Sequence, residues 1–207
     1  MGRTDAADNK GANKDGFDPA PLVMQARNGD RQAFHRLVDH YQPQILRMIH
    51  YRTRSRMDAE DLTQDVFLRA YKHIGRLEAP ALFRSWLYRI ALNRVRDHHR
   101  SQRVKSLIGF VSTASDDFRE TEATADAPEA PERLEAHAFR ERMAQLMESL
   151  SRKEKEAFML RFFDELSIKE MTAAMGKNES TVKTHLYRAL RKVKAAAGDG
   201  EAFWEVP

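Results

Sequence analysis

The sequence contains no cysteine. A disulfide framework, a thiolate zinc site and a cysteine nucleophile are therefore excluded. No apolar run approaches the roughly 18 residues of a membrane-spanning helix, and Met1–Asp18 lacks the apolar core of a signal peptide. These absences predict a soluble, cytoplasmic protein without membrane insertion.

The usual enzyme signatures are also missing. There is no glycine-rich phosphate loop, no nucleophile elbow and no pair of carboxylates in an evident cleft. Asp97, His98 and His99 invite a metal-phosphoesterase hypothesis. Adjacent histidines point about 100° apart on a helix, however, and no second ligand cluster supports them. The sequence therefore predicts a protein that is not an enzyme and holds no metal and no cofactor.

No stretch alternates with period two over a useful length. Apolar residues instead recur at three- and four-residue spacing from Pro21 to about Arg103, and again near the C-terminus. Between them, Ser112–Pro131 is too polar to offset the entropy of ordering it. We therefore expect an all-α fold of two small helical domains joined by a flexible acidic linker.

Charge is distributed unevenly around a net charge of +4. Residues 31–105 carry 16 Lys and Arg against 7 Asp and Glu, and residues 137–194 carry 13 against 8. Residues 116–135 reverse the balance, with 2 against 8. Two basic blocks around an acidic connector predict two surfaces that face a polyanion.

Short local signals predict where helices begin and end. Asn28, Gly29 and Asp30 separate a first short helix from one that begins near Arg31, and Pro43 must kink or restart that second helix. Further signals are two capping boxes, a glycine stop and an asparagine cap: Ser151 with Glu154, Ser167 with Glu170, Gly176, and Asn178.

A helix-turn-helix pattern follows from Ser167–Met175, a tight turn at 176–178, and a helix from Glu179 to about Ala195. One side of the last helix is apolar, through Val182, Leu186, Ala189, Leu190 and Val193. The opposite side carries hydroxyl and arginine groups that suit phosphates and base edges, namely Ser180, Thr184, Tyr187, Arg188 and Arg191. This stretch alone leaves DNA recognition and a merely solvated basic face equally open.

A second helix is predicted at Asp58–Ile74, with Asp58 as its cap. Its apolar side collects Leu62, Val66, Phe67, Ala70 and Ile74. Its opposite side carries acids around an exposed leucine, which favours a protein partner rich in Arg and Lys: Asp61, Gln64, Asp65, Leu68 and Lys72. The alternative is that Asp61 and Asp65 only favour the helix dipole, which is more credible for Asp61.

A third helix, at Pro80–Arg103, is apolar around most of its circumference, and Phe83 and Trp86 are assigned to core packing. The remaining wedge combines an asparagine with arginines, which suits phosphates and unstacked bases. It consists of Arg89, Asn93, Arg96, Arg100 and Arg103, with Asp97 at its margin.

In combination these motifs resemble the extracytoplasmic-function (ECF) sigma factors of bacterial RNA polymerase, a branch of the sigma-70 family. The resemblance covers about 21–103 and 140–195. It rests on the order of NGDRQAFHRLVDHYQPQI, DAEDLTQDVFLRAYKHIGRL, FRSWLYRIALNRVRDHHR and LSRKEKEAFMLRFFDELSIKEMTAAMGKNESTVKTHLYRALRKV. It implies an alternative sigma factor that binds core polymerase and recognises the minus-10 and minus-35 promoter elements.

The resemblance also implies a division of the chain. We expect a tail at 1–18, sigma region 2 at 19–106, a linker at 107–133, sigma region 4 at 134–197 and a C-terminal extension at 198–207. Asp61, Gln64, Asp65 and Leu68 would contact the β′ coiled coil of core polymerase, whose β flap is a further expected partner. An anti-sigma factor is also expected.

Promoter contacts are implied residue by residue. Asn93 and Asp97 would lie near a flipped minus-10 base, with Arg89, Arg96 and Arg100 on the DNA backbone. The minus-35 element would be read by Ser180, Thr181, Lys183, Thr184, Tyr187, Arg188 and Arg191. The alternative hypothesis is a helix-turn-helix regulator that binds duplex DNA without being a polymerase subunit. The GDGEAFWEVP extension is left without a role.

Overall fold

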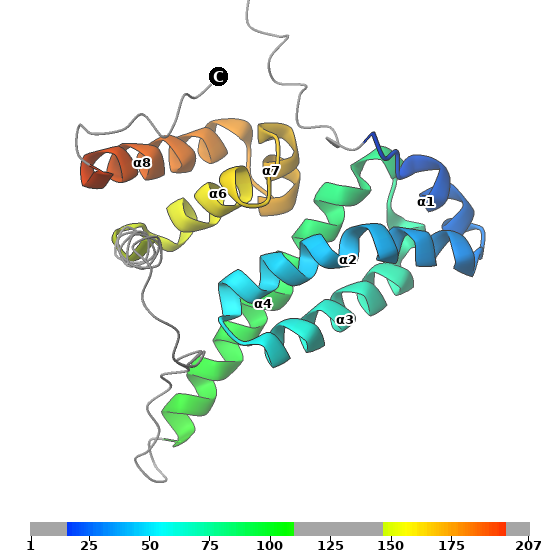
Figure 1. The fold of residues 1–207 in the computed structure, drawn as a ribbon, viewed down its shortest axis with the longest axis horizontal. Coiled ribbons are helices and arrows are strands. Elements are labelled where there is room, and N and C mark those ends of the chain that lie inside the picture. The colour runs from blue at the N-terminus through cyan, green and yellow to red at the C-terminus, as the bar shows by residue number, and fades with distance from the viewer. Residues whose placement is uncertain (1–15, 110–146, 198–207) are drawn as a thin grey trace, which may run out of the picture.

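The computed structural model describes residues 16–109 and 147–197 of the chain. The predicted tail, most of the predicted acidic linker and the C-terminal extension lie outside the described residues. Within them the chain forms α-helices and short 3-10 turns and no strand, which confirms the all-α prediction (Figure 1). None of the helices in these ranges is long and apolar enough to cross a membrane.

The N-terminal half is a helical bundle. It comprises α1 (Ala20–Arg27), α2 (Arg31–Thr53), α3 (Arg56–His73) and α4 (Phe83–Gly109), with short 3-10 turns at Ile74–Arg76 and Pro80–Leu82. Helix α2 packs against α1, α3 and α4. The core between them contains fully buried Leu37, Tyr41, Ile45, Phe83 and Leu87. The C-terminal end of α4 extends beyond the other helices (Figure 1).

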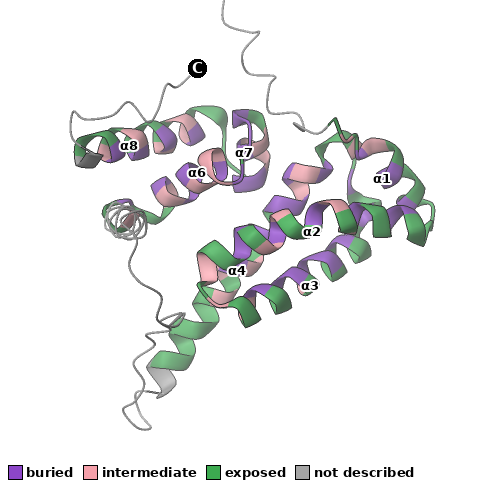
Figure 2. Cartoon of the chain, in the orientation of Figure 1, coloured by how far each residue is buried: buried purple, intermediate pink, exposed green. Residues whose placement is uncertain are grey.

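The C-terminal half contains α6 (Arg152–Phe162), α7 (Ile168–Met175) and α8 (Glu179–Ala197). Helix α8 packs on both α6 and α7. Its predicted apolar side is buried at Val182, Leu186, Ala189 and Val193, and Leu190 packs against the same core. Figure 2 shows buried and exposed residues alternating along α8.

Most of the predicted helix signals are confirmed. Ser151 and Ser167 each accept the N3 backbone N–H of their helix, and the N3 glutamate reaches back to each of them. Gly176 ends α7 in the left-handed conformation, at φ 62°, which glycine adopts without a steric penalty. The Asn178 side chain accepts the Thr181 backbone N–H at 2.8 Å.

One predicted cap was wrong, and one of the two alternatives predicted for Pro43 is excluded. The cap of α3 is Ser55, whose hydroxyl accepts the backbone N–H of Asp58 at 3.2 Å, so Asp58 lies in the first turn. Pro43 does not restart a helix, because α2 continues through it from Arg31 to Thr53. In addition, α4 begins only at Phe83 and runs to Gly109, into the stretch predicted as linker.

The two halves pack against each other, mainly through α4 and α7. Buried residues of both, including Leu87 and Tyr88 from α4 and Ile168 and Met171 from α7, belong to one continuous hydrophobic cluster. The predicted packing roles of Phe83 and Trp86 are confirmed, since Phe83 is fully buried and Trp86 packs on this cluster.

Candidate nucleic-acid interface

The outer face of α8 presents the side chains that the helix-turn-helix pattern predicted. Ser180, Thr184, Arg188 and Arg191 are exposed, and 58% of Tyr187 is exposed. The spacing of apolar residues along α8 produces this arrangement, because it directs the other side into the core. The structure therefore offers two aliphatic hydroxyl side chains, a tyrosine ring and two arginines to solvent on one helix face.

The first turn of α8 is less free than its middle. Thr181 and Lys183 are half-buried. Lys183 Nζ lies 2.6 Å from Glu179 Oε1, and the Thr184 hydroxyl donates to the Ser180 carbonyl at 2.8 Å. A surface ion pair between i and i+4 is weak, so Lys183 can exchange Glu179 for another anion at low cost.

The turn before α8 is held rigidly by α7. Glu170 Oε2 accepts the Ser167 backbone N–H and hydroxyl, both at 2.9 Å, which fixes the start of α7. Gly176 then ends α7, and Asn178 caps α8 two residues later. These caps set the angle at which α8 leaves the turn, and hence the direction in which its exposed face points.

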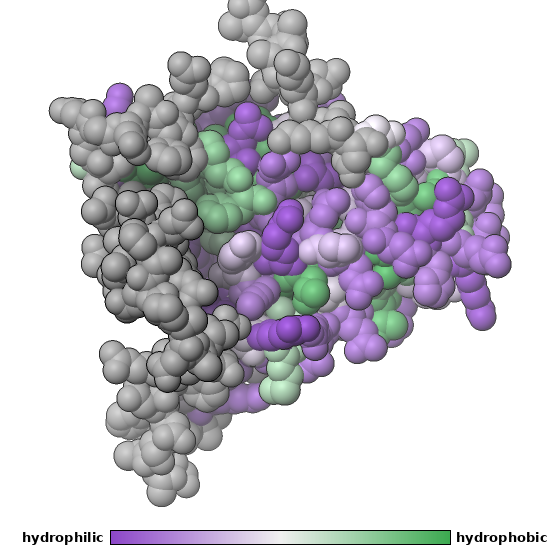
Figure 3. Space-filling view, in the orientation of Figure 1, coloured by the Kyte–Doolittle hydropathy of each residue, from purple (hydrophilic) through white to green (hydrophobic). Residues whose placement is uncertain are grey.

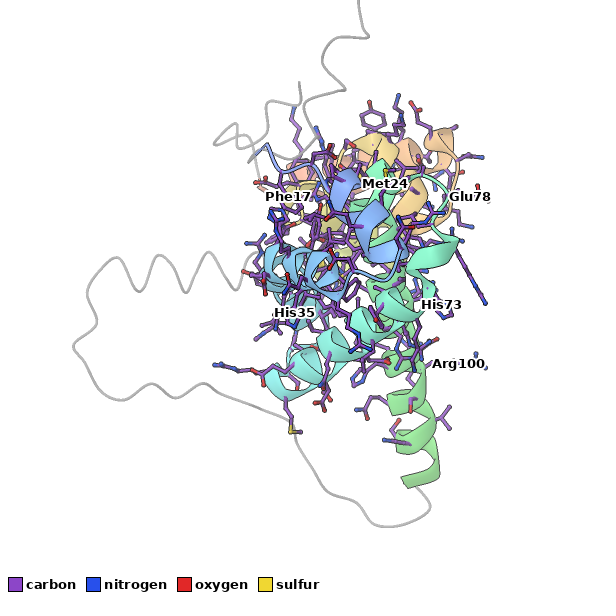
Figure 4. All side chains as sticks on the ribbon, turned by 90° about the vertical axis from the view of Figure 1, so that its right-hand side faces the viewer. Phe17, Met24, His35, His73, Glu78 and Arg100 are labelled. Atoms are coloured by element: carbon purple, nitrogen blue, oxygen red, sulfur yellow. The ribbon has the colours of Figure 1, made fainter. Side chains whose placement is uncertain are left out.

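Helix α4 brings the predicted arginine wedge together along one exposed stripe. Arg89, Asn93, Asp97 and Arg100 are exposed. Arg100 lies where α4 leaves the bundle (Figure 4). Arg96 is half-buried: its Nη1 donates to Asn93 Oδ1 at 3.0 Å, and its Nη2 lies 2.5 Å from Glu156 Oε1 of α6.

Helix α3 exposes Asp61, Gln64 and Leu68, with 53% of Leu68 accessible. Asp65 differs from these, because it is half-buried and pairs with Arg94 of α4 and with Arg69 at 3.2 Å. Arg94 also reaches Asp97 Oδ2 at 3.3 Å. One arginine therefore connects the acidic face of α3 to the margin of the α4 stripe.

Tyr71 extends the α3 face and was missed by the sequence analysis. It is 44% exposed and lies one turn beyond Leu68. Its ring makes an edge contact with Phe34 of α2, with 5.0 Å between centroids. The three-residue spacing from Leu68 was the available signal. The face of the described residues that Figure 3 shows is mainly hydrophilic, with one broader apolar patch beside the grey atoms at the upper left and smaller apolar spots elsewhere.

Two further arginines were also missed. Arg52 Nη2 lies 2.7 Å from Asp164 Oδ2, and both side chains are almost fully buried. Arg84 pairs with Glu170 at 3.0 Å and donates to the Asp164 carbonyl at 2.8 Å. Burial raises the pKa of Asp164, and the positive charge of Arg52 opposes that rise. No sequence signal was available, because these partners lie 80 or more positions apart.

The Asp97, His98 and His99 cluster does not form a metal site. His98 Nε2 faces Asp58 Oδ2 at 3.6 Å, and the two histidine rings meet at an angle. Within residues 16–109 and 147–197 there is no group of three His, Asp or Glu side chains that could hold a metal ion. The metal-phosphoesterase hypothesis therefore finds no support in this part of the chain.

A helical bundle with an arginine stripe, followed by a helix-turn-helix unit with a basic exposed face, defines a two-part helical protein suited to nucleic acid. Comparison with known families sharpens this class. Residues 37–104 match Sigma-70 region 2, and residues 140–193 match Sigma-70, region 4. The two matches lie in the order that the sequence motifs predicted.

Several ECF sigma factors are similar in sequence to this chain over both halves. The chain is 34% identical to the ECF RNA polymerase sigma factor BldN of Streptomyces coelicolor over 183 residues, covering 87% of this chain and 66% of BldN. It is 28% identical to ECF sigma factor SigW of Bacillus subtilis, covering 82% and 93%, and 28% identical to sigma-E of Escherichia coli, covering 81% and 88%.

A solved structure supports the fold. The structure of CnrH in complex with the cytosolic domain of CnrY matches with a TM-score of 0.63 at 24% identity, covering 89% of this chain and 100% of that one. The chain belongs to the ECF branch of the sigma-70 family. It is an alternative sigma factor that directs transcription initiation by RNA polymerase, which decides against the hypothesis of an independent helix-turn-helix regulator.

Proposed function

We propose that this sigma factor uses three separate helix faces: α3 for core polymerase, α4 for the minus-10 element and α8 for the minus-35 element. One observation carries the proposal. On each of these helices the apolar side is buried in a core, and the opposite side exposes side chains suited to the proposed contact. The proposed division assigns region 2 to 19–106 and region 4 to 134–197, with a tail, a linker and an extension outside them.

On α3, Asp61, Gln64 and Leu68 form the centre of the proposed polymerase contact, and Tyr71 extends its apolar part. An exposed leucine surrounded by acids complements a partner that offers basic side chains around an apolar position. The β′ coiled coil of core polymerase is the proposed partner for this face, and the β flap is the proposed partner for region 4. Asp65 contributes less than Asp61, because two arginines of the chain already share its charge.

On α4, Asn93 and Asp97 are proposed to contact an unpaired minus-10 base, with Arg89, Arg96 and Arg100 on the phosphates. The energy for strand opening then comes from binding to unpaired bases and to polymerase, and it requires no nucleotide hydrolysis by this chain. Exposed arginines suit the backbone because guanidinium groups bind phosphate oxygens in a fixed geometry.

On α8, Thr184, Tyr187, Arg188 and Arg191 are proposed to read the minus-35 duplex, and Ser180, Thr181 and Lys183 contact its backbone. The first turns of a recognition helix enter the major groove, where arginine and hydroxyl groups can reach base edges. The rigid caps around Gly176 hold this helix in position before DNA arrives.

An anti-sigma factor is a further proposed partner. The related CnrH structure was solved with the cytosolic domain of CnrY. A second neighbour, the sigma factor RpoE of Bartonella quintana, was solved with the anti-sigma factor NepR and matches this chain with a TM-score of 0.59 at 16% identity. Because this chain shares their fold, we expect it to accept such a partner as well.

Reconstituted transcription tests the proposal. Core RNA polymerase is incubated with the full chain on a library of promoter fragments, and transcripts and polymerase co-purification are both measured. We expect initiation from a subset of promoters that share minus-10 and minus-35 sequences. Initiation that persists unchanged after Asn93→Ala and Arg188→Ala would contradict the assignment of these faces.

A further inference from the structure

Three arginines of the N-terminal half meet three carboxylates of the C-terminal half across the contact between them. We call Arg52, Arg84 and Arg96 the arginine row, and Glu156, Asp164 and Glu170 the acidic face. The pairs are Arg52 with Asp164 at 2.7 Å, Arg84 with Glu170 at 3.0 Å, and Arg96 with Glu156 at 2.5 Å.

These pairs are shielded from water to different degrees. The side chains of Arg52 and Asp164 are 8% and 2% exposed, whereas Arg96 is 29% exposed. Hydrogen bonds between charged groups that are shielded from water are short and well aligned. Removing one side chain of such a pair leaves the charge of the other buried without a partner, which is destabilising. Packing supports them, since Tyr51 of α2 makes an edge contact with Phe163 at 5.7 Å between centroids. The two halves are thus held together by both charge and packing.

The contact lies on the proposed minus-10 surface itself. Arg96 is one of the proposed phosphate contacts, and Glu156 occupies it. Arg89 is a second, and its guanidinium lies 3.8 Å from where a Cβ on Gly176 would be, so the helix-turn-helix turn sits beside it. If α4 binds promoter DNA as proposed, the DNA and the C-terminal half cannot both occupy this part of the helix.

An arginine row without its acidic face would be a cationic surface next to Arg89 and Asn93. Guanidinium groups bind carboxylates and phosphates through the same planar fork of donors. The guanidinium donors that bind the carboxylates of Glu156, Asp164 and Glu170 can therefore also bind the phosphates of a DNA backbone.

We propose that the arginine row is a phosphate-binding part of the promoter interface, and that the acidic face of the chain's own C-terminal half occupies it in the free protein. The proposal rests on the proposed minus-10 role of α4 and adds Arg52 and Arg84 to it. DNA and the acidic face compete for the same guanidinium groups, so the free chain binds DNA only in the fraction of molecules that is open.

The first measurement reports opening. Because the chain has no cysteine, Arg36→Cys in α2 and Lys194→Cys in α8, both at exposed positions, allow spin labels to be attached at two defined sites. Pulsed dipolar spectroscopy then gives the distance between the halves. We expect one narrow distance in the parent protein, and a shifted, broader distribution after Glu156→Gln or Asp164→Asn. Glu148→Gln, an exposed carboxylate near α6, removes the same charge outside the contact and is the matched control.

The second measurement reports DNA binding. A fluorescent single-stranded oligonucleotide of mixed sequence is titrated with the full chain, and anisotropy is followed at several salt concentrations. Glu156→Gln should raise affinity about tenfold, because one charged hydrogen bond no longer favours the closed form. Arg52→Gln should also open the chain, but without the gain in affinity for the oligonucleotide. It should reduce the steepness of log affinity against log salt concentration by about 0.7, because one phosphate contact is lost.

Each outcome decides a different point. If the labels in the parent protein already report a broad distribution of distances, the acidic face does not cover the arginine row. If Glu156→Gln opens the chain but binds the oligonucleotide no better than Glu148→Gln, or if Arg52→Gln gains as much affinity as Glu156→Gln, the row does not bind phosphate. Failure of the parent protein to initiate transcription with core polymerase would instead contradict the proposed function, whatever the labels show.

Discussion

Reversing the charge of Asp61 is the most direct test of the polymerase surface on α3. Asp61 is exposed, and it makes no ion pair with any residue of the described ranges. Asp65 is less suitable, because Asp65→Arg would also break its pairs with Arg69 and Arg94. The effect of Asp61→Arg is therefore confined to the partner, whereas Asp65→Arg also disturbs the contact between α3 and α4.

Coulomb's law sets the size of the expected effect. A unit charge pair about 5 Å apart is worth about 0.8 kcal/mol in bulk water and about 3 kcal/mol at an effective dielectric constant near 20. A reversal changes the interaction by two charges, and physiological salt screens part of it. We expect Asp61→Arg to weaken binding to core polymerase by about 2 kcal/mol, which is roughly a 30-fold rise in Kd.

The assay is a titration of fluorescently labelled full chain with core polymerase, at low and at physiological salt. Asp39→Arg is the matched control, because it makes the same charge change at an exposed position of α2. We expect the loss for Asp61→Arg to be larger at low salt and the control to bind nearly as the parent does. An equal loss for both variants, or no loss for Asp61→Arg, would refute the assignment of this face.

Three further predictions concern the other helices. Arg188→Ala should reduce initiation at minus-35-dependent promoters about 10- to 100-fold in run-off transcription, because a base contact is worth about 1–3 kcal/mol, and it should leave core binding unchanged. Asn93→Ala should slow initiation on duplex promoters more than on promoters whose minus-10 region is already unpaired, and an equal effect on both templates would contradict a role in base capture. Glu154→Gln should remove a part of the folding stability that depends on pH. A hydrogen bond from Lys192 and one from the Ser151 backbone lower the pKa of Glu154 from 4.5 to about 2. The ionised Glu154 therefore stabilises the fold above pH 4.5, and this stabilisation is lost as pH falls toward 2. Since Lys192 is 40% exposed, we expect only about 1–2 kcal/mol, measured as a gap between the parent and Glu154→Gln in denaturant unfolding at pH 7 that narrows at pH 3.

Helix faces and caps were predictable because they depend on residues close together in the sequence. The 3.6-residue period placed Val182 and Leu186 in the core and Tyr187 and Arg188 on the surface. The capping boxes at Ser151 and Ser167 need only a serine and a glutamate three residues apart. The same reasoning assigned the wrong cap to α3, because Asp58 and Ser55 are both competent caps and only the observed start of the helix at Arg56 distinguishes them.

Contacts between the halves were not predictable from local pattern. Arg52, Arg84 and Arg96 look like ordinary basic residues in a basic block, and nothing near them in the sequence identifies Asp164, Glu170 or Glu156 as their partners. Pro43 shows a related limit. Its missing N–H and its ring disfavour a helix locally, yet α2 continues through it, with Tyr41 and Ile45 on either side fully buried in the core.

Arg94 shows why exposure and pairing together, rather than residue type, decide what a charged side chain can do. It touches Asp65 on the proposed polymerase surface and Asp97 on the proposed minus-10 surface. If the proposed α3 contact brings a basic side chain of polymerase to Asp65, that side chain would compete with Arg94 for the carboxylate, and Arg94 would keep Asp97 as its partner. We therefore expect the ionic surroundings of Asp97 to depend on what is bound at α3. In this arrangement, a charge change at Asp65 reaches the minus-10 surface through one side chain, while a change at Asp61 does not.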